Sequence, residues 1–98
     1  MILLDRSRID CLTNTHAIEF DFNDKWAEAI GQSLHYARMT GARAGVVLIL
    51  SKPNAEVHLD RLTRTIDHYG LPIDVWTIGE NDFSIKIEPI EFSPEGGY

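Results

Sequence analysis

The sequence predicts a small α/β domain with one mixed sheet, whose strands and helices follow the order β-β-α-β-α-β-β. Three observations predict this class. Residues 17–22 alternate between apolar and polar side chains and run directly into an amphipathic helical pattern. Residues 44–50 form a continuous apolar run, which is typical of a central strand covered on both faces. A second helical pattern then separates this run from two further strands.

Length and composition limit what the chain can be. It has 98 residues, of which 44% are hydrophobic, so we expect one domain over residues 1–92 with a small core. Residues 93–98 contain a proline and two glycines and are expected to form a flexible tail. Cys11 is the single cysteine, which excludes an intrachain disulfide and favours a reducing compartment. No segment approaches the roughly 20 apolar residues that span a bilayer, so we expect a soluble, cytoplasmic protein.

The first part of the chain has the pattern of a β-hairpin. Residues 8–12 and 17–22 are the predicted strands, and Thr13-Asn14-Thr15-His16 is the predicted loop. Period-two alternation divides the second strand into two faces. We expect Ile18, Phe20 and Phe22 on the core face and Ala17, Glu19 and Asp21 on a polar face. Cys11 alternates away from Asp10 and is interpreted as a core residue.

Two helices follow. The first is expected to start with Asn23 or Asp24 as N-cap and to end near Thr40, where Gly41 can adopt the left-handed conformation. Its predicted buried stripe contains Trp26, Ile30, Leu34 and Ala37. The second is expected to start after residues 51–54 and to end at Gly70. Its apolar positions are Leu59, Leu62, Ile66 and Tyr69.

Two strands complete the prediction. Residues 73–78 form the first of them. In the second, which is half-exposed, Phe83, Ile85 and Ile87 alternate with Ser84, Lys86 and Glu88.

The formal charge of −6 argues against an extended nucleic-acid surface, because non-specific affinity for phosphates comes from clustered Lys and Arg. It does not exclude a nuclease, since carboxylates that hold a divalent cation count as negative until the metal is bound.

A group of polar residues is concentrated at the junction of the hairpin and the first helix. Glu19 and Asp21 lie on one face of the second strand, and Asp10 can lie across from them in the hairpin. At about 100° per residue, Lys25, Gln32 and Tyr36 fall on one line along the helix. Lys25 is in the first turn, so its ammonium is expected to reach the space next to the carboxylates.

This arrangement resembles the PD-(D/E)XK nuclease superfamily. The similarity covers residues 8–50 and consists of Asp10, Glu19-Phe20-Asp21 and a helix with Gln32-x-x-x-Tyr36, an element similar to that of the RecB-like branch. The resemblance implies a restriction endonuclease-like core and metal-assisted hydrolysis of DNA with Mg²⁺ or Mn²⁺. This chain differs from the superfamily at the motif lysine, because Asp21 occupies that position, and Lys25 is placed to supply a lysine from the helix instead.

The resemblance also implies a role for each matching residue. Asp10 and Glu19 become metal ligands and catalytic residues, with the Phe20 carbonyl and Asp21 as further possible ligands, and Lys25 assists the attacking water. Gln32 and Tyr36 would orient a backbone phosphate or the lysine. His16, in the predicted loop, could contact a phosphate.

Other readings stay open. The protein could be a non-catalytic relative that serves as a binding or assembly module, or an acidic inhibitor that mimics nucleic-acid charge. Each polar residue taken singly is also compatible with a solvated surface. His58, Asp60 and His68 on the second helix are interpreted as surface residues. For the nuclease, we expect a homodimer or a larger complex, because a domain this small offers little surface to grip DNA.

Overall fold

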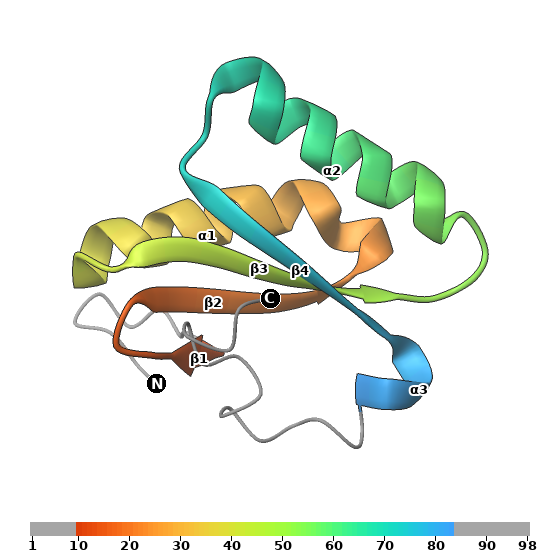
Figure 1. Cartoon of the computed structure of the whole chain (residues 1–98), viewed down its shortest axis with the longest axis horizontal. Helices are drawn as coiled ribbons and strands as arrows, with labels where there is room; N and C mark the ends of the chain where they lie inside the picture. The colour runs from red at the N-terminus through yellow and green to blue at the C-terminus, as the bar shows by residue number, and fades with distance from the viewer. Residues whose placement is uncertain (1–9, 84–98) are drawn as a thin grey trace.

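The computed structural model describes residues 10–83 (Figure 1). It contains a four-stranded sheet and two long helices, in the order β-β-α-β-α-β that the sequence predicts for this part of the chain. The elements are β1 (Cys11–Leu12), β2 (His16–Phe22), the 3₁₀ turn η1 (Asn23–Lys25), α1 (Trp26–Thr40), β3 (Arg43–Leu50), α2 (Ala55–Tyr69), β4 (Ile73–Gly79) and the short α3 (Glu80–Phe83).

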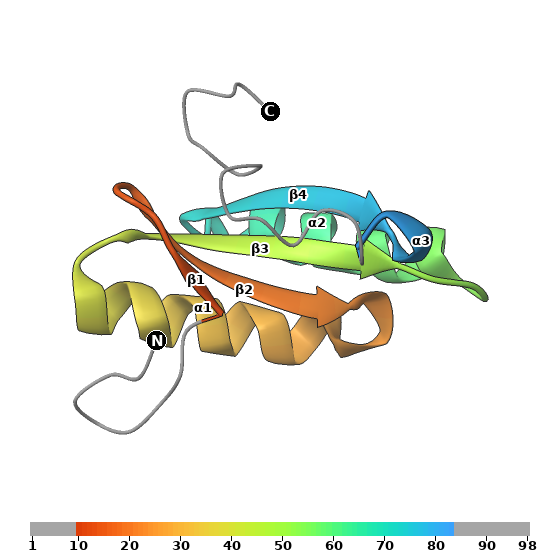
Figure 2. The ribbon, with the colours of Figure 1, turned by 90° about the horizontal axis from the view of Figure 1, so that it is seen from below.

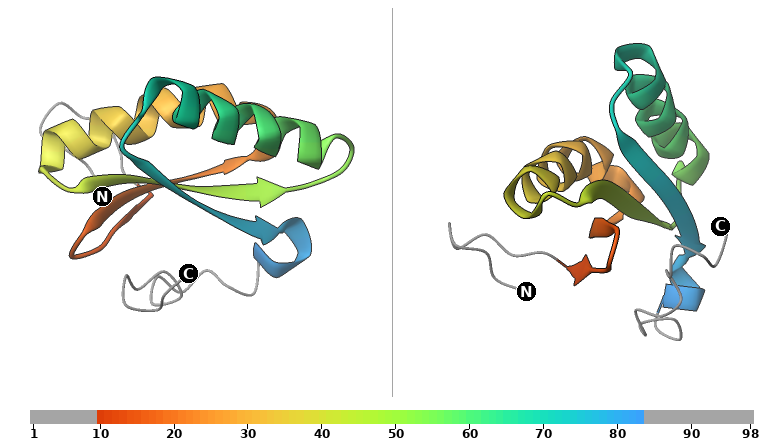
Figure 3. Two further views of the ribbon diagram at one scale, coloured as in Figure 1. Left: turned by 45° about the horizontal axis from the view of Figure 1, so that its top comes forward. Right: turned by 60° about the vertical axis from the view of Figure 1, so that its left-hand side comes forward.

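The sheet has the strand order β1-β2-β3-β4 (Figure 2). β1 pairs with β2 in the antiparallel direction, whereas β2, β3 and β4 are parallel to one another. The helices α1 and α2 make the two crossovers between the parallel strands. Because the strand order advances in the same direction through both crossovers, both helices lie on the same face of the sheet (Figure 3).

The main core lies between these helices and the sheet. Buried side chains of β3, which include Ala44, Val46 and Leu48, contact Leu62 and Ile66 of α2. The predicted stripe of α1 packs against the same cluster, and its members are Trp26, Ile30, Leu34 and Ala37. β3 is therefore the central strand that its continuous apolar run predicts.

A smaller apolar cluster lies on the opposite face of the sheet. Ile18 of β2 and Val47 of β3 are fully buried there, with Cys11, Phe20 and Trp76 packed around them. Cys11 is thus a partly buried packing residue, as predicted, and burial raises the pKa of its thiol. Phe22 was expected in the core but is 46% exposed, because it is the last residue of β2 and extends beyond this cluster.

The helix ends confirm one set of predictions and correct another. Gly41 and Gly70 both adopt positive φ at the C-terminal caps of α1 and α2. Neither Asn23 nor Asp24 caps α1, because both residues belong to η1, which precedes that helix. Tyr69 is 71% exposed at the end of α2, so it is a surface residue.

Most of the last predicted strand lies outside the described residues. Phe83 belongs to α3, which corrects its assignment to a strand, whereas residues 84–88 and 93–98 lie outside the described residues. Residues 8 and 9 of the predicted first strand also lie outside them. Within residues 10–83, no helix is long and apolar enough to cross a membrane.

Candidate functional site

The carboxylates of the hairpin lie on the helix side of β2. Ala17 packs against Tyr36 of α1, and Glu19 and Asp21 follow Ala17 at the two-residue spacing that keeps side chains on one face. The β1–β2 register pairs Cys11 with Ile18, so its continuation puts Asp10 opposite Glu19. The grouping of Ala17, Glu19 and Asp21 on one face is confirmed. The assignment of that face as the polar, non-core side of the strand is wrong, because α1 covers it and buries Ala17 and Glu19.

A main-chain hydrogen bond fixes Asp10. The N–H of Phe20 donates to Oδ2 of Asp10 at 2.9 Å. The bond crosses the hairpin at the position next to Glu19. The carboxylate of Asp10 is therefore held beside Glu19 by the backbone of β2, before any ligand binds.

Glu19 is the most strongly perturbed carboxyl of the group. Its side chain is buried, with the residue only 6% exposed. Burial raises its pKa to about 9, with further contributions from a hydrogen bond to Asp21 and from the negative charge of Asp10. At neutral pH, Glu19 therefore keeps its proton and can donate it in the hydrogen bond to Asp21.

Asp21 has capacity for another ligand. Its Oδ2 atom is buried and has no hydrogen-bond partner. Burial raises the pKa of Asp21, as do the charges of Asp10 and Glu28, while the hydrogen bond from Glu19 and the charge of Lys25 act in the opposite direction. A buried carboxylate oxygen without a partner costs free energy, so a cation or a donor that reaches it is stabilised there.

The predicted residues of the first helix occupy different environments. Lys25 is exposed at the end of η1, close enough to Asp21 for its charge to lower the pKa of that carboxyl. Gln32 is exposed on α1, whereas Tyr36 is only 7% exposed and packs against Ala17 and Ala42. Of the three residues predicted to share one face, Lys25 therefore lies near the carboxylates, Gln32 lies in solvent and Tyr36 lies in the core.

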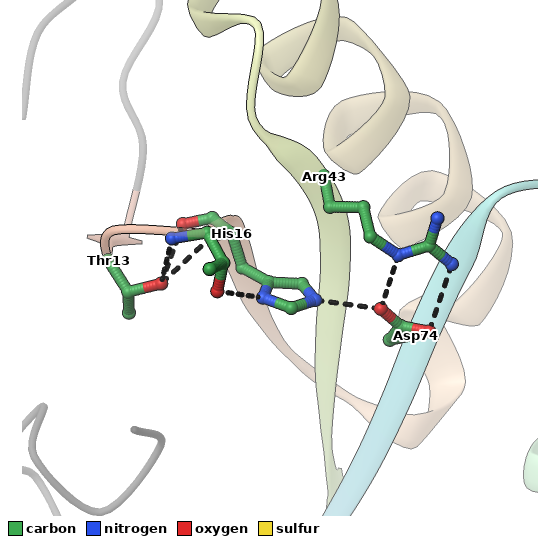
Figure 4. A network of polar contacts seen from close by, with 5 residues as sticks. Thr13, His16, Arg43 and Asp74 are labelled. Carbon is green, nitrogen blue, oxygen red and sulfur yellow. Dashed lines mark hydrogen bonds and ion pairs between the residues drawn. The ribbon is translucent and has the colours of Figure 1, made fainter. Parts of the chain in front are cut away.

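His16 does not lie where the sequence predicts. It is the first residue of β2, not a loop residue, and it is buried on the face opposite to Glu19. Its Nε2 atom is 2.7 Å from Oδ2 of Asp74 (Figure 4). Its Nδ1 atom is 2.7 Å from the hydroxyl of Thr15. The short turn after β1 causes this difference, because Oγ1 of Thr13 accepts a hydrogen bond from the N–H of His16 at 2.9 Å.

Asp74 also binds Arg43, so this network joins the first residues of β2 and β3 to β4. Nε and Nη2 of Arg43 donate to the two carboxylate oxygens at 2.7 and 3.1 Å (Figure 4). Hydrogen bonding to Arg43 and His16 lowers the pKa of Asp74 to about 2, although partial burial opposes the shift. We assign the network a structural role at the amino-terminal edge of the parallel strands.

A pocket of about 580 Å³ lies at the opposite edge, where the parallel strands β2 and β3 end. Ligands commonly bind at the carboxyl ends of parallel strands in α/β folds. Asp21 and Lys25 line the pocket on one side, and Lys52 and His58 line it on another. Sequence reasoning missed Lys52 and treated His58 as a surface residue, because nothing in the local pattern relates the β3–α2 connection or α2 itself to the end of β2.

Carboxylate oxygens are among the ligands that a hard cation such as magnesium takes. Within the described residues, no group of three or more His, Cys, Asp and Glu side chains is arranged to hold a metal ion. Magnesium usually binds through one or two carboxylates together with waters and substrate phosphates. Asp10 and Glu19 lie side by side, and Oδ2 of Asp21 has no hydrogen-bond partner, so these oxygens are of the chemical type that such an ion takes, although they are not arranged around one position in the structure.

Comparisons with protein-family models, with curated proteins and with solved structures find no match to this chain. Its function is therefore inferred from the site.

Proposed function

We propose that this protein is a nuclease that hydrolyses DNA phosphodiester bonds with the help of Mg²⁺ or Mn²⁺. The observation that carries the proposal is the juxtaposition of Asp10, Glu19 and Asp21 on one side of β2, next to the exposed Lys25. The proposal agrees with the resemblance of residues 8–50 to the PD-(D/E)XK superfamily.

In this proposal, Asp10 and Glu19 would hold the ion through their carboxylate oxygens. Glu19 would have to lose its proton to hold the ion, because a ligating carboxylate must be ionised. When bound, magnesium supplies Lewis-acid chemistry that stabilises the negative charge developing on the phosphate. Asp21, whose Oδ2 atom has no hydrogen-bond partner, would be a further residue able to hold the ion.

Lys25 supplies the positive charge that the superfamily places two residues after the acidic ligand. Its flexible side chain is exposed and lies within electrostatic reach of Asp21. It can therefore approach a phosphate held beside the carboxylates and orient the attacking water. Gln32 is exposed and free to contact the DNA backbone, whereas the buried Tyr36 supports the contact between α1 and β2.

One observation favours a second candidate, a non-catalytic binding or assembly module. Asp21 occupies the position of the motif lysine, and its carboxylate adds negative charge where a nuclease needs positive charge. A module of this kind keeps the fold and lacks cleavage in every metal condition.

Cleavage assays separate the two candidates. Labelled single-stranded, duplex and branched DNA are incubated with wild-type protein in Mg²⁺, in Mn²⁺ and in EDTA. We expect metal-dependent products that disappear in Glu19→Gln, which removes the ionisable group and keeps the shape of the side chain. Asp67→Asn is the matched control, because Asp67 is an exposed carboxylate on α2, remote from the hairpin.

Calorimetric titration with Mn²⁺ adds a second measurement. Wild-type protein and Asp67→Asn should bind the ion, and Glu19→Gln should bind it at least tenfold more weakly. Wild-type protein without metal-dependent cleavage of any of the three substrates would contradict the nuclease and favour the module. For the active protein we also expect a homodimer, since one copy of this small domain contacts little of a duplex.

A further inference from the structure

The pocket at the carboxyl ends of β2 and β3 has the size and the chemistry to hold one nucleotide. Its volume of about 580 Å³ lies in the range of small-molecule sites, which is roughly 300–1,000 Å³. Asp21 belongs to both the carboxylate group and the pocket lining, so the pocket adjoins the proposed reaction centre.

Phe22 gives the pocket an aromatic wall. It is 46% exposed, although it is a large apolar side chain at the end of a strand. Exposed aromatic rings next to charged groups are the usual platforms on which single-stranded bases stack. Among the large hydrophobic side chains of residues 10–81 that are exposed, Tyr69 is the other aromatic one, and it lies at the far end of α2, outside the pocket.

The polar lining matches a phosphate and a base edge. Lys25 and Lys52 are both exposed and both line the pocket, where they can bind a phosphate on either side of the base. His58 contributes a buried Nδ1 atom that has no hydrogen-bond partner. A buried polar atom of this kind is satisfied when a ligand brings it a partner.

The pocket is built on a rigid frame. Asn23 is only 3% exposed, and its Oδ1 accepts hydrogen bonds from the N–H of Ser51 at 2.6 Å and from the Ser51 hydroxyl at 3.2 Å. These bonds join the residue after β2 to the residue after β3. The backbone segments that carry Phe22 and Lys52 are therefore joined directly to each other at the pocket.

We propose that this pocket binds the nucleotide next to the scissile phosphate, with its base stacked on Phe22 and its phosphate bound by Lys52. The inference rests on the proposed nuclease function and specifies its substrate. A base can enter the pocket only after it has left the helical stack, and that step is easiest in a strand that is already unpaired. The preferred substrate is therefore single-stranded DNA or an unpaired strand end.

Binding to DNA in EDTA tests the inference without requiring cleavage. The probes are a fluorescein-labelled eight-nucleotide single strand and a labelled blunt hairpin of eight base pairs, measured by anisotropy at low salt. We expect wild-type protein to prefer the single strand. Phe22→Leu keeps an apolar side chain and removes the ring, so it should weaken single-strand binding at least about fivefold. Phe22→Trp should restore it.

Two variants outside the pocket serve as matched controls. Tyr69→Leu removes an exposed ring outside the pocket, and Arg61→Gln removes an exposed cation outside it. Both should leave binding unchanged, whereas Lys52→Gln should weaken it and reduce its salt dependence.

Equal affinity for the two probes, no binding to either, or an unchanged affinity in Phe22→Leu would overturn the inference. These outcomes are distinguishable from a failure of the nuclease proposal, which is decided by products in Mg²⁺ or Mn²⁺. If the protein cleaves DNA and Phe22→Leu leaves single-strand affinity unchanged, the nuclease proposal stands and the nucleotide pocket is contradicted. If Phe22→Leu weakens single-strand binding and no metal-dependent cleavage is found, the pocket stands as a single-strand binding site and the nuclease proposal is contradicted.

Discussion

Oδ2 of Asp10 accepts a hydrogen bond from the N–H of Phe20 at 2.9 Å, and this bond holds a carboxylate beside the buried Glu19. Two acidic groups so close together cannot both ionise without cost. The burial of Glu19 adds to that cost, and the pKa of Glu19 accordingly rises to about 9.

Asp10→Asn tests this relationship directly. The amide keeps an oxygen that can accept the N–H of Phe20 but removes the negative charge that helps to raise the pKa of Glu19. We therefore expect the Glu19 pKa to fall in this variant. Carboxyl carbon chemical shifts followed through a pH titration measure it, and an unchanged Glu19 titration would show that Asp10 exerts no electrostatic effect.

The raised pKa of Glu19 predicts how stability depends on pH. Its ordinary pKa of 4.5 becomes about 9 in the folded protein, so between these values the folded state binds more protons than the unfolded chain. Stability is therefore largest below pH 4.5 as far as Glu19 is concerned, and it falls as the pH rises towards 9. Glu19→Gln removes this dependence.

Thermal melts of wild-type protein and Glu19→Gln test the direction of this pH dependence. At pH 8 we expect Glu19→Gln to melt higher than wild-type protein, by about 4–8 °C for each kcal/mol gained. The difference should shrink towards pH 5. A variant that unfolds at a lower temperature than wild-type protein at pH 8 would instead assign Glu19 a stabilising structural role.

Two glycines form a matched pair for stability. A Cβ atom at Gly45 would lie 2.9 Å from Cζ3 of Trp76 and 3.3 Å from Cγ1 of Ile18, whereas one at Gly31 would meet nothing within 4 Å. We expect Gly45→Ala to destabilise the protein by about 1–3 kcal/mol through overpacking. Gly31→Ala should stabilise α1 by about 0.5–1 kcal/mol. Urea unfolding measures both, and a Gly45→Ala variant as stable as wild-type protein would contradict the close packing.

The fold was predictable where short-range patterns determine it. The apolar run of β3 and the left-handed glycines after both helices are local signals, and they predict the central strand and the helix ends correctly. The hairpin register, which puts Asp10 opposite Glu19, also follows from a short connection.

The orientation of the site was not predictable in the same way. Alternation in β2 separates Glu19 and Asp21 from Ile18 and Phe20, but it does not say which face α1 covers. The small side chains of Ala29 and Ser33 let α1 pack on the polar face, and both residues are fully buried. His58 reaches the pocket only because β3 ends beside β2, which is a long-range relationship.

The network around Asp74 predicts a second, independent pH effect. Its pKa falls from 3.8 to about 2 through hydrogen bonds from Arg43 and His16, so its contribution to stability is present above pH 3.8 and is lost as the pH falls towards 2. We expect Asp74→Asn to cost about 1 kcal/mol at neutral pH, a modest value because the side chain is 39% exposed. Urea unfolding at pH 7 and pH 3 measures it. If Asp74→Asn lowers the free energy of unfolding equally at pH 7 and pH 3, the contribution of Asp74 is not electrostatic.

Lys25 separates an active nuclease from a non-catalytic module. If its ammonium acts on the phosphate beside the carboxylates, Lys25→Ala should lower the cleavage rate at least about a hundredfold, while the affinity for Mn²⁺ changes little. Arg61→Ala is the control, because it removes another exposed cation away from the site. Asp21→Lys in the Lys25→Ala background restores a lysine at the motif position of β2 and should recover part of the activity. Cleavage that survives in Lys25→Ala at the wild-type rate would rule out the transfer of the catalytic lysine from the strand to the first helix.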